Sequence, residues 1–146
     1  MKLTAFLAAA VLAVAVSAPA LAVSDKDAET FLLTPALFEK MKKAEPELKA
    51  LNIEDDSEEE DEDSESTVND IIKSIEKHPR AKAVLAKHGL SSKEMALASV
   101  AMLHAGMYVM LEGQMDKKGA AQLMASYTRE QKANIALMRT MAKAGK

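Results

Sequence analysis

The segment between Ser91 and Gly113 constrains the fold more than any other part of the chain. Ser91 and Glu94 form a capping box, which predicts a helix over residues 92–112 that Gly113 ends. One side of this helix carries Met95, Ala98, Met102, Ala105 and Val109, a second carries Val100, Leu103, Met107, Met110 and Leu111, and only the sector with Lys93, Glu94, His104, Tyr108 and Glu112 is polar. A helix so apolar is expected at the centre of a bundle, covered on most sides.

The composition predicts an all-α protein. Alanine, leucine, methionine, lysine and glutamate dominate the chain, and these residues favour helices, whereas β-branched residues are few. The chain has no cysteine. Thiol catalysis, disulfide exchange, iron–sulfur clusters and covalently attached c-type haem are therefore excluded, and packing alone must hold the protein together.

The first 22 residues are typical of a secretory signal. Lys2 supplies a positive start, residues 5–16 are almost wholly apolar, and Ala20-Leu21-Ala22 provides the small residues of a cleavage site. We expect residues 1–22 to be a signal peptide that is removed after Ala22, and the protein to be periplasmic or secreted. An uncleaved N-terminal anchor is the alternative. No later stretch predicts a transmembrane span.

The residues after the signal predict a polar, mobile leader and one helix, which together form a region over residues 23–53. The leader covers residues 23–29. Thr34-Pro35 is a helix start, and apolar residues continue at helical spacing to residue 51. Pro46 lies inside this pattern, so the helix over 35–51 is expected to be kinked or broken there.

Residues 67–146 predict the main domain, a small helical bundle. Thr67 with Asp70 starts one helix, His78-Pro79 ends it, and a short helix then runs to Gly89. The helix over 92–112 follows, then a weaker helical pattern at 118–126, and a last helix after the capping box of Thr128 and Gln131. In all, the pattern predicts a bundle of about four to five helices, with the helix over 35–51 packed loosely against it or tethered to it.

An acidic segment separates the two regions. Residues 54–65 carry ten acidic residues and no basic one, and residues 54–66 are expected to form a disordered linker because they have nothing apolar to bury. The order of ligands and the glycine that an EF-hand needs are both missing. Diffuse cation binding by residues 54–65 is one alternative. Contact with the remainder of the mature chain, where 18 lysines and arginines outnumber 12 acids, is another.

Two parts of the chain carry a resemblance. The first comprises Ile75-Glu76-Lys77-His78-Pro79, Leu85-Ala86-Lys87-His88-Gly89-Leu90 and the alanine-rich 96–106. The second is Ala133-Asn134-Ile135-Ala136-Leu137-Met138-Arg139. Over residues 67–142 the chain resembles a group of small exported helical proteins of Gram-negative bacteria. The resemblance implies an exported helical bundle in the periplasm, and it implies no activity and no catalytic residue.

The most specific candidate chemistry is a copper site. His104, Met107 and Met110 supply imidazole and thioether groups, which suit Cu(I). On a helical wheel, however, Met110 lies about 120° from His104, so three ligands from one helix do not easily converge. Methionine also fills apolar cores. His78 and His88 stand beside Pro79 and Gly89 and are interpreted as helix-boundary residues, since no further zinc ligands accompany them.

No other pattern predicts catalysis. Ser91, Ser92 and Ser99 lie at a helix start or on a helix face, without the glycines of a nucleophile elbow. Few aromatic residues are present, and export argues against nucleic-acid binding. We therefore expect a non-enzymatic binding or interaction protein with no cofactor and an unknown protein or envelope partner. Its contact surface is expected on the first helix, the acidic segment or the last helix. Copper handling and small-ligand binding inside the bundle are the alternatives.

Overall fold

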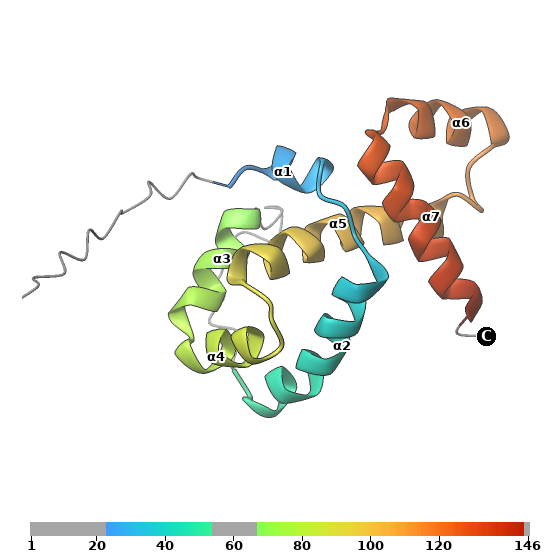
Figure 1. Ribbon diagram of the computed structural model, residues 1–146. Coiled ribbons are helices and arrows are strands. Elements are labelled where there is room, and N and C mark those ends of the chain that lie inside the picture. The colour runs from blue at the N-terminus through green and yellow to red at the C-terminus, as the bar shows by residue number, and fades with distance from the viewer. Residues whose placement is uncertain (1–22, 54–66, 145–146) are drawn as a thin grey trace, which may run out of the picture.

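A computed structural model describes residues 23–53 and 67–144, and these residues form an all-α protein (Figure 1). The expected signal peptide and acidic linker lie outside the described residues. Seven helices are present where the structure is described: α1 (Asp25–Glu29), α2 (Pro35–Ala50), α3 (Val68–Lys77), α4 (Pro79–Lys87), α5 (Ser92–Leu111), α6 (Lys117–Ser126) and α7 (Arg129–Ala144). Five of these helices, α3 to α7, lie in the region for which a bundle of four to five helices is expected, and α1 and α2 precede it.

Helix ends lie where local chemistry predicts them. The capping boxes of Thr67 with Asp70 and of Ser91 with Glu94 are both formed. Gly89 has a φ of +68° and closes α4 as a Schellman motif, in which the Leu90 amide donates to the Leu85 carbonyl at 2.9 Å. The weaker pattern near residue 118 does form a helix, α6. Helix α2 continues through Pro46, so a break at that residue is excluded.

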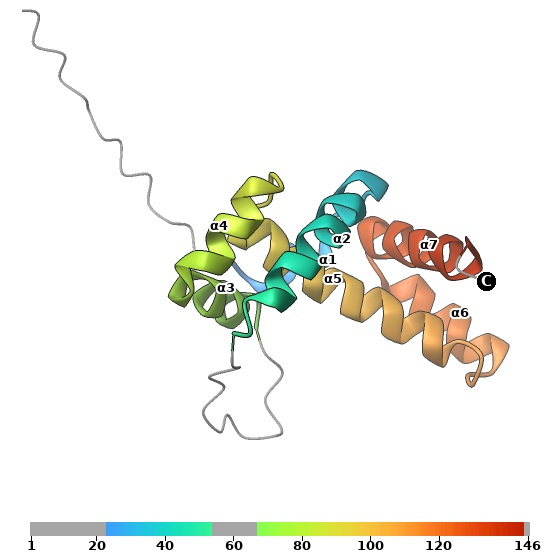
Figure 2. The same ribbon diagram turned by 90° about the horizontal axis from the view of Figure 1, so that it is seen from below.

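Helix α5 is the central helix of the fold. Figures 1 and 2 show α3 and α4 near its first turns and α6 and α7 near its last turns, and α2 crosses near its middle. Buried residues of α5 belong to all three apolar clusters of the described residues. Most of them are small: Ala96, Ala98, Ala101 and Ala105. Because an alanine side chain ends at its Cβ, neighbouring helices can approach α5 closely.

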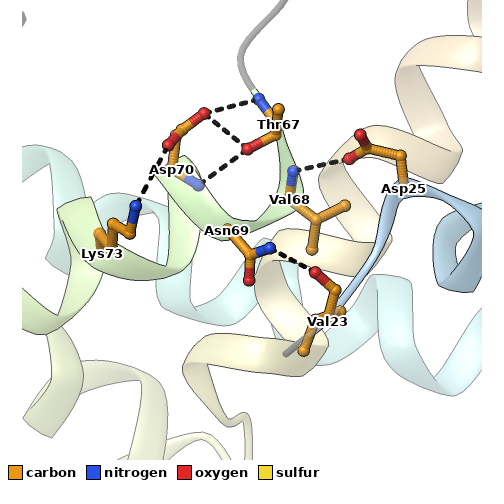
Figure 3. A network of polar contacts seen from close by, with 7 residues as sticks. All are labelled: Val23, Asp25, Thr67, Val68, Asn69, Asp70 and Lys73. Carbon is orange, nitrogen blue, oxygen red and sulfur yellow. Dashed lines mark hydrogen bonds and ion pairs between the residues drawn. The ribbon is translucent and has the colours of Figure 1, made fainter. Parts of the chain in front are cut away.

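Residues 23–33 pack into the fold, which corrects the expectation of a mobile leader. The Val68 amide, at the start of α3, donates to the Asp25 carboxylate at 3.1 Å, and the Asn69 side chain donates to the Val23 carbonyl (Figure 3). Val23 and Ala28 are buried in one cluster with Val68, Ala96 and Leu97 on α3 and α5. The sequence did not indicate this packing because the expected leader, residues 23–29, contributes only two buried apolar side chains, Val23 and Ala28.

Helix α2 also joins the core more closely than the sequence indicated. Leu37 and Ala44 are buried in one cluster with Leu85 of α4 and with Ala98 and Ala101 of α5. The Lys87 ammonium and the His88 ring both contact the Glu47 carboxylate at 2.9 Å, which adds polar contacts between α2 and the end of α4. The helix over 35–50 is therefore an integral part of the structure.

A buried asparagine holds the start of the chain to its last helix. Asn134 of α7 is 1% exposed, its Oδ1 accepts from the Leu33 amide at 2.8 Å, and its Nδ2 donates to the Phe31 carbonyl at 2.8 Å. The amide side chain thus satisfies two backbone groups of the extended segment between α1 and α2. A buried backbone group left without a partner costs about 1–3 kcal/mol.

We predict that Asn134→Ala lowers the free energy of unfolding by about 2–4 kcal/mol, because both backbone groups lose their partner. Chemical denaturation followed by circular dichroism measures this loss. Thr140→Ala on the exposed side of α7 is the control, and its effect should stay within about 0.5 kcal/mol. Equal stability of the two variants would contradict the role given to Asn134.

Candidate functional site

The second half of α5 exposes apolar side chains along one side. Leu103 is 56% exposed, Met107 48%, Met110 77% and Leu111 45%. These four residues, named here the α5 face, recur at the spacing of one helix side. The expectation that α5 is covered on most of its circumference is therefore correct for the first half of the helix and wrong for the second.

Within the sector expected to be polar, Lys93, Glu94 and His104 are exposed, whereas Tyr108 faces inward. Tyr108 is 4% exposed, its hydroxyl donates to the Ala120 carbonyl of α6 at 3.2 Å, and its ring meets the Tyr127 ring edge to face at 5.7 Å. Arg139 of α7 lies over the Tyr108 ring at 5.7 Å and pairs with Glu112. These contacts turn the Tyr108 sector toward α6 and α7, so Met107 and Met110 point outward.

A groove adjoins the α5 face. It has a volume of about 480 Å³ and lies between α1, α3 and α5, where Leu103 forms part of both the groove and the face. Its other apolar lining residues are Ile71 and Val100, and its charged lining residues are Asp25 and Glu29. The hollow is open and large enough to accept several side chains of another molecule.

The interior offers much less room. A cavity of about 10 Å³ lies between α1, α5 and α7 and is lined in part by His104, Gln131 and Asn134. This volume holds about one water molecule. The cavity thus gives no support to the alternative of a small ligand bound inside the bundle.

The residues of the copper alternative lie on the exposed part of α5. Met107 and Met110 belong to the α5 face, and His104 is exposed beside it and also lines the groove. Among residues 23–53 and 67–144, no three His, Asp or Glu side chains gather in a way that could hold a metal ion. A site made with methionine sulfur is not tested by that observation, so copper binding stays a prediction.

The remaining candidates from the sequence have structural partners. His78 and His88 stand at helix ends, as expected. The hydroxyl of Ser92 donates to the Glu76 carboxylate at 2.8 Å, and that of Ser99 to the Met95 carbonyl at 2.8 Å, while Ser91 caps α5. These hydroxyls secure helices and their ends.

Comparisons with protein-family models, with curated proteins and with solved structures gave no match. The site is therefore interpreted from its own residues. Helix α5 is the one helix of the described residues that is long and apolar enough to cross a membrane, a property that buried core helices share. Its first half is buried among α1, α3 and α4.

The α5 face was not apparent in the sequence, although one signal pointed to it. Val100, Leu103, Met107 and Met110 are separated by three, four and three residues, the spacing of a seam that packs against another helix. The chain supplies eight large apolar residues after Gly113, and Ile135 is the one that is buried among the described residues. The sequence therefore provided no measure of how much of the seam they cover.

The ion pair that orients this half of α5 should make stability depend on pH. Hydrogen bonding from Arg139 holds the pKa of Glu112 below its ordinary value of 4.5. Because the pKa is lower in the folded state, the ion pair stabilises the fold fully above about pH 4.5, and this contribution is lost as the pH falls through the lower folded value.

We predict that Glu112→Gln lowers the free energy of unfolding at neutral pH and that the difference from the wild type shrinks in acid. Denaturation at a series of pH values from about 6 to 3 measures it. Arg139→Gln should abolish the same pH-dependent difference, because it removes the other partner. A difference that stays constant over this range would show that the pair does not act in this way.

Proposed function

We propose that this chain is an exported, non-enzymatic interaction protein and that the α5 face is its contact surface. The observation that carries the proposal is the run of four exposed apolar side chains, Leu103, Met107, Met110 and Leu111, on one side of the central helix. Contiguous exposed apolar surface on a small protein commonly marks a site for another macromolecule. Methionine suits such a site because its flexible side chain adapts to the shape of a partner.

The surface differs from the one expected from the sequence, which was the first helix, the acidic segment or the last helix. Leu37 and Ala44 of α2 and Asn134 and Ile135 of α7 are buried within the fold, so both helices are engaged in packing. We propose that the acidic residues 54–66 act as a disordered linker and that the protein works in the periplasm. The predicted signal peptide and the resemblance to exported helical proteins support this location.

We predict that the Met107→Lys/Met110→Lys double variant loses its partner while the fold remains stable. Charges on this face oppose its burial, so retention of envelope partners on immobilised protein should fall about tenfold. The free energy of unfolding should change by less than about 1 kcal/mol, because both side chains are largely exposed. Met141→Lys is the matched control, since Met141 is a 40% exposed methionine on α7. Equal retention by all three proteins would refute the proposed surface.

Export is tested separately. We predict that a Gram-negative host expressing the full chain releases the protein on osmotic shock, and that mass spectrometry finds Val23 as its first residue. Intact residues 1–22 in the membrane fraction would instead establish the anchor alternative.

Copper handling is the second candidate, favoured by the accessibility of His104, Met107 and Met110 on successive turns of α5. Met107→Leu/Met110→Leu separates the two functions, because it removes both sulfur atoms and keeps the face apolar. On the interaction proposal this variant retains the partner. On the copper proposal it loses Cu(I) binding that the wild type shows at micromolar or tighter affinity, and no such binding by the wild type would exclude copper.

A further inference from the structure

We infer that the groove and the α5 face together bind one cationic amphipathic helix of a partner protein. The inference rests on the proposed function and names the chemistry of its partner. Three features carry it: the spacing of the apolar residues, the continuity of groove and face, and the charge of the groove.

The apolar residues are spaced to receive a helix. The exposed residues Leu103, Met107 and Met110 follow the four-and-three spacing of a helix–helix seam, and Val100, which precedes them in the pattern, is buried in the core. From Leu103 to Met110 the exposed side runs for about 10 Å along α5, or about two helical turns. An amphipathic helix that places apolar residues on one side matches this geometry.

The groove extends the seam toward α1 and α3. Leu103 belongs to the face and lines the groove together with Val100 and Ile71, so the apolar surface continues from the open half of α5 to the side of α3. A helix lying on the face can therefore place side chains into a volume of about 480 Å³.

The negative charge of the groove favours a partner that carries positively charged side chains. Asp25 and Glu29 are four residues apart on α1, both are exposed, and neither forms an ion pair with another described residue. No described lysine or arginine lines the groove, and His104 is its one basic side chain there. Lysine or arginine beside the apolar side of a partner helix would meet these two carboxylates.

The same charge argues against a second copy as the occupant. In a pair of copies, each groove carries the same two carboxylates. Neither groove is lined by a described lysine or arginine that could pair with the carboxylates of the other copy. Oligomeric state is therefore an outcome of the test.

The experiment uses the purified chain and a labelled synthetic helix of about 18 residues, with leucine on one side and lysine on the flanking positions. Fluorescence anisotropy should detect binding of this peptide, weaker binding in high salt, and no binding of the same peptide with glutamate in place of lysine. Equal binding of the lysine and glutamate peptides would overturn the inference.

Two pairs of variants locate the binding site. Glu29→Lys should weaken the lysine peptide about five- to tenfold, whereas Glu39→Lys, the same charge change at an exposed site of α2, should have little effect beyond the change in net charge. Leu103→Ser should weaken it by about tenfold or more, whereas Leu32→Ser, at a 51% exposed leucine, should not. Circular dichroism confirms that each variant folds.

The outcomes separate this inference from the function on which it rests. If the peptide fails to bind while Met107→Lys/Met110→Lys still loses its envelope partner, the function stands and the cationic helix is refuted. If that variant keeps its partner, the proposed surface itself fails. A dimer in sedimentation that Leu103→Ser dissociates would assign the face to a second copy and overturn the inference.

Discussion

The buried side chain of Asn134 is the contact on which the arrangement of this fold depends. It satisfies backbone groups at Phe31 and Leu33, about a hundred residues away in sequence, and so joins the first part of the chain to the last helix. Both joined segments pack beside α5. A side chain that carries both an NH₂ donor group and a carbonyl acceptor suits this position, because the segment between α1 and α2 presents one carbonyl and one amide to α7. Apolar packing alone would leave both groups without a partner.

The burial of each half of α5 depends on the side chains that the neighbouring helices place against it. Its first half presents alanines, and α1, α3 and α4 reach it closely enough to bury Ala96, Ala98 and Ala101. In its second half, α7 covers Ala105 and Tyr108 through Ile135, while α6 contributes no buried residue. The surface opposite α7 is left open, and it is the surface that carries the larger side chains, Leu103 and Met110.

The sequence predicted the features that depend on neighbouring residues, and it missed those that depend on contacts between segments far apart in the chain. Helix starts at Thr67 and Ser91, the end at His78-Pro79 and the turn at Gly89 all depend on residues within one helical turn, and each is confirmed. The orientation of the second half of α5 is different. Tyr108 was expected outside and is buried, because Ala120, Tyr127 and Arg139 give its polar and aromatic groups partners that the pattern of α5 alone does not contain. The anchoring of residues 23–28 depends likewise on Val68 and Asn69, beyond the acidic segment.

An exposed apolar face would promote aggregation unless something opposes contact between copies. The carboxylates of Asp25 and Glu29 lie at one end of this face, and ten further acids occur between residues 54 and 65 of the same chain. Like charges of this kind repel other copies at a range of about 10 Å at moderate ionic strength. The same carboxylates attract a helix that carries lysine or arginine beside its apolar side. The two groove carboxylates therefore disfavour contact between identical grooves and favour the cationic partner proposed for the groove.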